Sequence, residues 1–90
     1  MAVEVTAVHM AGGDRHEHIA EVKWTNPQTQ ATGSSTTAPM VDWLENQNGQ
    51  AYVSDGTNTV NIGGVDASPK YLRTYADGIW TDNLLALPRY

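Results

Sequence analysis

The chain has 90 residues, a formal net charge of −5 and no cysteine. This length predicts a single domain over residues 1–90, because domains usually take about 100–200 residues. The lack of cysteine excludes disulfides, zinc–thiolate centres and thiol catalysis. The five scattered basic residues form no stripe for extended contact with nucleic acid. We find no apolar run approaching a membrane span and no signal-peptide pattern in residues 1–5, so we expect a cytoplasmic protein.

Two alternating segments in the N-terminal part, residues 3–10 and 18–25, predict strands. The glycine-containing segment 11–14 predicts a turn between them, so the two strands form a hairpin. One register keeps the apolar residues together on one face, as burial of that face requires. It gives the facing pairs Ala7–Ala20, Val5–Val22, Val3–Trp24 and His9–His18.

The middle of the chain predicts a weak, polar edge strand over residues 30–35 and then one helix. Thr36 or Thr37 is a suitable N-cap, and residues 48–49, Asn-Gly, are typical of a helix end. Met40, Val41 and Leu44 form an apolar stripe along the helix, which we expect to pack on the sheet.

The C-terminal half predicts strands at residues 50–54, 59–62 and 70–75, with turns at 55–58, 68–69 and 77–78. A single helical turn follows at residues 83–87, and Pro88 ends it. Together these elements predict an α+β fold. Its five- or six-stranded, mostly antiparallel sheet is built from hairpins, with one helix packed on one face.

Four segments carry a resemblance to a known family: residues 12–19 (GGDRHEHI), 40–44 (MVDWL), 71–78 (YLRTYADG) and 81–88 (TDNLLALP). In this order, the chain resembles a family of small bacterial and phage proteins catalogued as domain of unknown function three-eight-nine-two. The resemblance covers nearly the whole chain and implies a bacterial or phage origin. It implies no activity, so no catalytic residue is transferred from it.

Three histidines suggest a metal site. His16 and His18 lie two residues apart, so on an extended segment both rings point to one side. His9 would join them across the hairpin. Neutral imidazoles suit zinc, copper or nickel, and zinc is the cofactor to consider. The alternative is that these histidines are ordinary polar residues at the end of a hairpin.

A small anionic ligand, a nucleotide or phosphate, is a second possibility. Glycine-rich turns expose backbone N–H groups to anions, and arginine binds phosphate with two hydrogen bonds. The candidate residues are Arg15, His16, His18 and Arg73. The turn does not precede a helix, so it matches neither a P-loop nor a dinucleotide-binding motif. The alternative is a plain hairpin turn.

The remaining polar and aromatic residues favour structural roles. Arg73 is expected to pair with a nearby aspartate, Asp77 or Asp82, and to lock the C-terminal turn. Trp24, Trp43 and Trp80 are expected in the core or at its edge, with an aromatic platform for a base or a peptide as the alternative.

The residues thus favour a non-enzymatic binding or protein-interaction module, with a protein partner or self-association. A catalytic constellation is missing from the sequence pattern, and uncharged aromatic side chains are available for an interface. Small-ligand binding at Arg15, His16, His18 and Arg73 is the alternative, followed by a metal site at His9, His16 and His18.

Overall fold

A computed structural model of the chain describes residues 2–54, 57–67, 70–76 and 79–90. The predicted turns at residues 68–69 and 77–78, and the first half of the turn at 55–58, lie outside the described residues.

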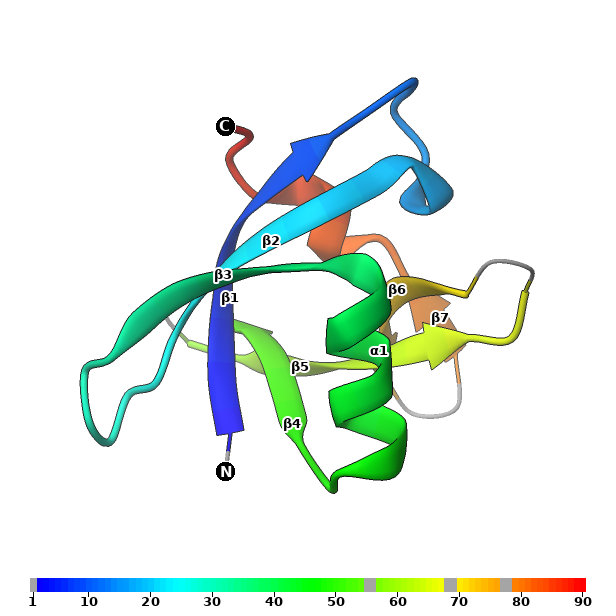
Figure 1. Cartoon of the computed structure of the whole chain (residues 1–90). Coiled ribbons are helices and arrows are strands. Elements are labelled where there is room, and N and C mark those ends of the chain that lie inside the picture. The colour runs from blue at the N-terminus through cyan, green and yellow to red at the C-terminus, as the bar shows by residue number, and fades with distance from the viewer. Residues whose placement is uncertain (1, 55–56, 68–69, 77–78) are drawn as a thin grey trace.

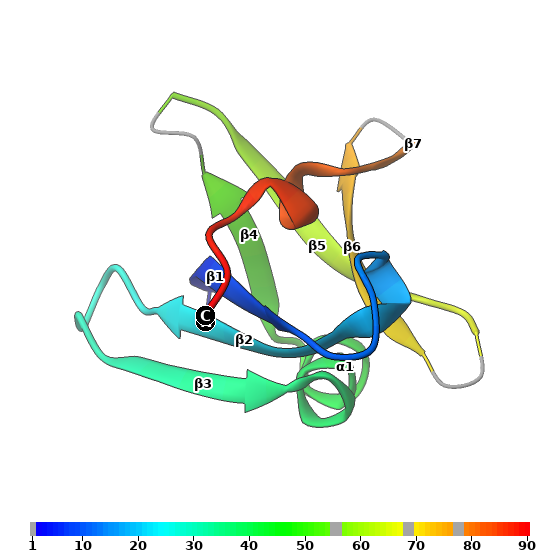
Figure 2. The same ribbon diagram turned by 90° about the horizontal axis from the view of Figure 1, so that it is seen from above.

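Within these ranges, seven strands form one sheet in the order β3-β2-β1-β4-β5-β6-β7. The strands are β1 (Ala2–Met10), β2 (Ile19–Thr25), β3 (Thr32–Thr36), β4 (Gln50–Ser54), β5 (Thr59–Val65), β6 (Tyr71–Ala76) and β7 (Ile79–Thr81). The helices are α1 (Thr37–Asn46) and the two short 3₁₀ helices η1 (His16–His18) and η2 (Asn83–Ala86). Of the strand pairs described, β1–β4 is parallel and the others are antiparallel. Figures 1 and 2 show a strongly curved sheet with β3 and β7 at its two ends.

The α+β class, the single α-helix and the mostly antiparallel sheet are therefore confirmed, but the strand count is not. We predicted five or six strands, and the structure has seven. The additional strand is β7, which pairs with β6. It has three residues, too few for an alternating pattern to stand out in the sequence.

The predicted register of the first hairpin is wrong. The structure pairs Val5 with Trp24, Val8 with Val22 and His9 with Glu21. The pairing shifts between Val5 and Ala7, where β1 carries an extra residue, and again between His9 and Met10. The first shift changes which residues face the core, so Val8 is buried in place of Ala7. Strict alternation cannot anticipate such a bulge.

Helix α1 begins and ends as the sequence predicts, and its apolar stripe faces the sheet. Met40 and Val41 are buried, and the partly buried Leu44 packs against the hydrophobic core. The helix comes very near to β5 at Gly64, where an added Cβ would lie 3.2 Å from Val41 and 3.1 Å from Glu45. A glycine here lets the helix and the sheet approach each other closely. In the described part of the chain, no helix has the length and apolar character needed to cross a membrane.

The C-terminal residues complete the edge of β1. Of the described residues of β1, Ala2–Glu4 pair with β4, and the rest of β1 extends beyond this strand. Further along β1, the N–H of Val8 donates to the Pro88 carbonyl (3.0 Å), and the N–H of Tyr90 donates to the Val8 carbonyl (3.1 Å). Figure 2 shows the C-terminal segment running next to β1. Backbone groups that β4 leaves free are therefore satisfied by the end of the chain.

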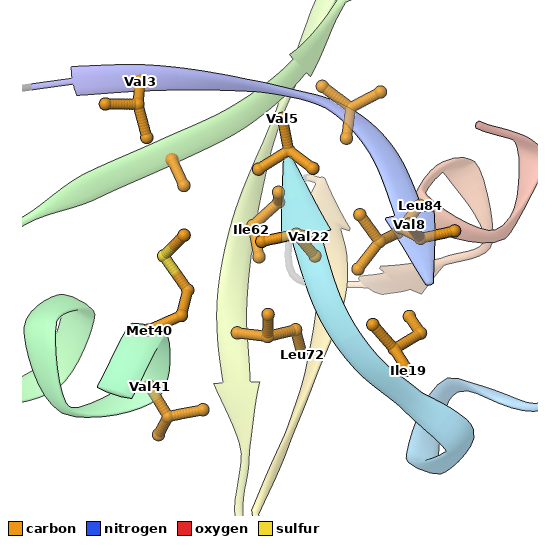
Figure 3. Packing of buried hydrophobic residues seen from close by; sticks show 12 residues of the cluster. Val3, Val5, Val8, Ile19, Val22, Met40, Val41, Ile62, Leu72 and Leu84 are labelled. Atoms are coloured by element: carbon orange, nitrogen blue, oxygen red, sulfur yellow. The ribbon is translucent and has the colours of Figure 1, made fainter. Parts of the chain in front are cut away.

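The core lies in the concave side of the curved sheet, between β1, β2, β5, β6, α1 and η2 (Figure 3). Leu72 and Leu84 are its largest fully buried apolar side chains. Twelve hydrophobic residues form it: Val3, Val5, Val8, Ile19, Val22, Met40, Val41, Ala51, Val53, Ile62, Leu72 and Leu84. Aliphatic residues dominate the centre, and Trp24 and Trp43 pack at its margin.

Candidate functional site

The segment that carries His16 and His18 is a 3₁₀ turn and not an extended strand, so the predicted common face of the two rings is wrong. The N–H of His18 donates to the Arg15 carbonyl (2.9 Å), which closes the turn. Because successive residues of a 3₁₀ helix are about 120° apart, residues i and i+2 point in different directions. His16 is buried and His18 is half-buried.

His16 is the first residue of η1, and 8% of its surface is exposed. Its Nε2 has no hydrogen-bond partner among the described residues and lies 3.7 Å from Asp82 Oδ1. Burial lowers the pKa of His16 below its usual value, and the Arg73 guanidinium lowers it further, against the opposing charges of Asp82 and Glu17. The neutral imidazole is therefore the form that the folded protein favours.

Arg73 and Asp82 form the ion pair that the sequence predicts. Arg73 Nη2 donates to Asp82 Oδ1 (3.0 Å), and its Nε donates to the Thr81 carbonyl (3.1 Å). These bonds tie β6 to the segment that leads into η2. The structure thus gathers His16, Arg73 and Asp82 at one place, although only the Arg73–Asp82 contact could be expected from the sequence.

The other predicted site residues make their contacts elsewhere. The His18 ring covers Gly13, where an added Cβ would lie 2.5 Å from Nδ1, and this Nδ1 accepts a hydrogen bond from the Arg15 N–H (3.2 Å). His9 Nδ1 donates to the Tyr90 carbonyl, and the predicted His9–His18 pair is not formed, because His9 faces Glu21. Within the described ranges, no three His, Cys, Asp or Glu residues form a group that could hold a metal. The zinc site remains a prediction.

Each of the five basic side chains already has an intramolecular partner. Arg73 pairs with Asp82, Lys70 with Glu45 and Arg89 with Asp14. Lys23 lies over the Tyr90 ring, 4.4 Å from its centroid, and Arg15 lies 3.9 Å from Glu17. The Arg15–Glu17 pair is exposed and contributes little to stability. An anionic ligand would have to compete with these contacts.

The burial of His16 leads to an expected pH dependence of stability. Its pKa is lowered in the folded state, so below about pH 6.5 the unfolded chain takes up a proton that the folded chain resists. The free energy of unfolding should therefore fall as the pH drops below 6.5. Urea unfolding between about pH 7.5 and 5.5, above the range where carboxylates titrate, measures this effect. In His16→Leu the fall should be clearly smaller, and an equal fall in the variant would refute the assignment.

Three exposed large apolar side chains lie at the β7 end of the sheet, and we call them the β7 edge cluster: Tyr75 and Trp80 on one face of the sheet, and Ile79 on the other. Ile79 is 67% exposed, and Tyr75 and Trp80 are 44% and 39% exposed. The rings of Tyr75 and Trp80 meet edge to face with centroids 5.1 Å apart. Among the described strands, β7 has a neighbour on one side only. The sequence pattern places Trp80 in the core or at its edge, with an aromatic platform as the alternative, and it does not predict that Trp80 lies exposed beside Tyr75.

A small apolar pocket opens near the other end of the sheet, between α1 and β1–β3. It has a volume of about 250 Å³ and is lined by Val3, Trp24, Ser35, Pro39, Met40 and Trp43. Both tryptophans lie against glycines: an added Cβ at Gly33 would be 2.6 Å from Trp24, and one at Gly49 would be 2.2 Å from Trp43. Trp24 Nε1 donates to Ser35 Oγ (3.2 Å). The pocket walls are thus held in place by packing and by this hydrogen bond.

The fold and these surfaces define a small α+β domain with two open sheet edges. The chain belongs to the family described as "Protein of unknown function (DUF3892)", whose model matches residues 4–88. This finding confirms the resemblance seen in the sequence. Searches of curated proteins and of solved structures gave no match.

Proposed function

We propose that the protein is a non-enzymatic protein-interaction module that self-associates through the β7 edge cluster. The observation that carries this proposal is the exposure of three large apolar side chains at this end of the sheet, two on β7, whose outer edge is open, and Tyr75 on the neighbouring strand β6. An exposed apolar edge strand is a ready template for pairing with another chain. We place this function in the cytoplasm of a bacterial or phage-infected cell, in line with the sequence analysis.

The geometry favours a second copy of the chain as the partner. Two β7 strands related by a two-fold axis would pair antiparallel and set the two clusters against each other, as in an isologous dimer. The three side chains carry no charge, and the neighbouring Arg73 and Asp82 neutralise each other. Although the chain carries a net charge of −5, charge repulsion between two copies should be weaker at this uncharged surface than at an acidic part of the surface.

A charge placed in the cluster should abolish self-association. We expect the apparent mass of the wild-type protein to rise above the monomer mass of 9.8 kDa as its concentration is raised. The series should extend to about 1 mM, because a small interface of this kind is typical of weak complexes. Ile79→Glu should stay monomeric over the same range, since its carboxylate would be buried without a partner. Sedimentation equilibrium makes the comparison.

The matched control is Gln28→Glu, which adds the same charge at the exposed turn after β2. It should associate like the wild type. A wild-type chain that remains monomeric throughout, or an Ile79→Glu variant that associates equally well, would contradict the proposal.

Binding of a small anion by Arg15, His16, His18 and Arg73 is a second proposal. It is supported by the closeness of His16 and Arg73, which meet around Asp82. It ranks lower because Asp82 already neutralises Arg73 and because His16 Nε2 is buried.

A further inference from the structure

We propose that the β3 edge binds an extended peptide, which adds a strand to the sheet and inserts one large apolar side chain into the pocket of Trp24 and Trp43. This surface lies at the opposite end of the sheet from the β7 edge cluster (Figure 2). The inference therefore does not depend on self-association through β7.

The pairing of β1, β2 and β3 determines which backbone N–H and C=O groups of β3 point away from β2. The N–H and C=O of Val8 bond to residues 88–90, so they point away from its partner Val22. Hydrogen-bonded and non-bonded pairs alternate in antiparallel ladders, so Val22 bonds to Ser35 on its other side. The N–H of Asn26 donates to the Ala31 carbonyl (2.7 Å), which fits the same alternation. Thr32 and Ser34 therefore direct their backbone N–H and C=O outward.

This edge lacks the features that normally protect an edge strand. Residues 32–36, Thr-Gly-Ser-Ser-Thr, include no charged residue and no proline. The pairing of β3 with β2 shows no bulge. Natural sheets usually block their edges with lysine, proline, a bulge or a covering segment. Among the described residues, no strand pairs with the outer side of β3.

The pocket adjoins this edge and determines what the peptide must carry. Ser35 of β3 forms part of the pocket wall, and no lining residue is charged. About 250 Å³ is below the roughly 300–1,000 Å³ of ordinary small-molecule sites. It suits a single side chain such as leucine, methionine or phenylalanine. In strand addition, main-chain hydrogen bonds provide affinity and pockets for alternate side chains provide specificity.

A second copy of the chain fits this edge poorly. If two β3 strands paired, the residues next to the pocket would be Gly33 and Ser35 of the other copy, because these two lie on the half-buried face of β3. Neither has a side chain that would fill the cavity. A separate peptide with a large apolar residue is therefore the occupant that matches both the open edge and the pocket.

Selection from a random 12-residue peptide library against the folded protein tests this proposal. We expect enriched peptides to carry one large apolar residue within an extended polar stretch. Ser34→Pro removes an outward N–H without breaking the ladder to β2, and proline is tolerated at such edge positions. It should weaken binding at least ten-fold. Ser34→Ala keeps the N–H and should bind within about two-fold of the wild type.

N-methylation of a selected peptide provides a test that needs no protein variant. Methyl groups at alternate residues should abolish binding, and methyl groups at the residues between them should leave it intact, because only every second N–H faces β3. The proposal is overturned if no peptide is enriched, if Ser34→Pro binds as tightly as the wild type, or if N-methylation shows no alternation. Ile79→Glu should bind the peptide as tightly as the wild type. A failure of peptide binding can therefore be told apart from a failure of self-association through β7.

Discussion

Leu84→Ala should lower the free energy of unfolding by about 3–5 kcal/mol, the upper part of the range for leucine-to-alanine changes in cores. Leu84 is 0% exposed and comes from η2, a single turn near the end of the chain. Its side chain belongs to the buried hydrophobic core (Figure 3). A domain of this size has about 5–13 kcal/mol of stability in all, so this loss would be a large share of it.

Urea unfolding monitored by tryptophan fluorescence measures the effect of Leu84→Ala. The matched control is Leu85→Ala, in the same turn but only partly buried, which should cost about 1 kcal/mol. Equal losses in the two variants would show that η2 does not seal the core as described.

Thr74→Val should cost about 2–4 kcal/mol, although the two side chains have nearly the same shape. Thr74 is fully buried, and its hydroxyl makes all the bonds that it can. It donates to the Thr81 carbonyl (3.0 Å) and accepts from Thr81 Oγ1 (2.7 Å) and from the Asn83 N–H (3.1 Å). Valine would leave the part-buried Thr81 hydroxyl and Asn83 N–H without this partner, at about 1–3 kcal/mol for each one left unsatisfied, whereas the Thr81 carbonyl keeps its bond from Arg73 Nε.

The variant Thr74→Ser distinguishes the contribution of the Thr74 hydroxyl to stability from that of its methyl group. Serine keeps all three hydrogen bonds and loses one buried methyl, so we expect a cost of about 1 kcal/mol. Chemical unfolding of both variants gives the order of stability. A valine variant that is as stable as the serine variant would mean that the Thr74 hydroxyl does not hold β6, β7 and η2 together.

Local signals in the sequence were enough for much of the fold. Alternation and turn residues predicted β4 with its observed ends at Gln50 and Ser54. The cap at Thr36 and the apolar stripe predicted α1, which starts at Thr37. Pro88 and the leucines before it predicted the turn that became η2. In each case the information lies in a few neighbouring residues.

Non-local contacts account for what the sequence could not predict. The bulge after Val5 lets Val8 reach the core, and a strictly alternating register has no place for it. The turn at His16 forms because this side chain is buried beside Arg73 and Asp82, which lie more than 50 positions further along the chain. The Arg73–Asp82 pair was predictable because it spans only nine positions. The exposure of Trp80 depends on β7 ending the sheet, which strand order alone decides.

A concentration series of proton–nitrogen correlation spectra shows whether the β7 edge cluster is a contact surface between copies of the chain. We expect a higher concentration of the wild-type protein to shift the amide signals of Tyr75, Ile79 and Trp80 and the Trp80 indole N–H signal, while the signals of β1 and β4 stay unchanged. A spectrum without concentration-dependent shifts, or shifts confined to other strands, would contradict it.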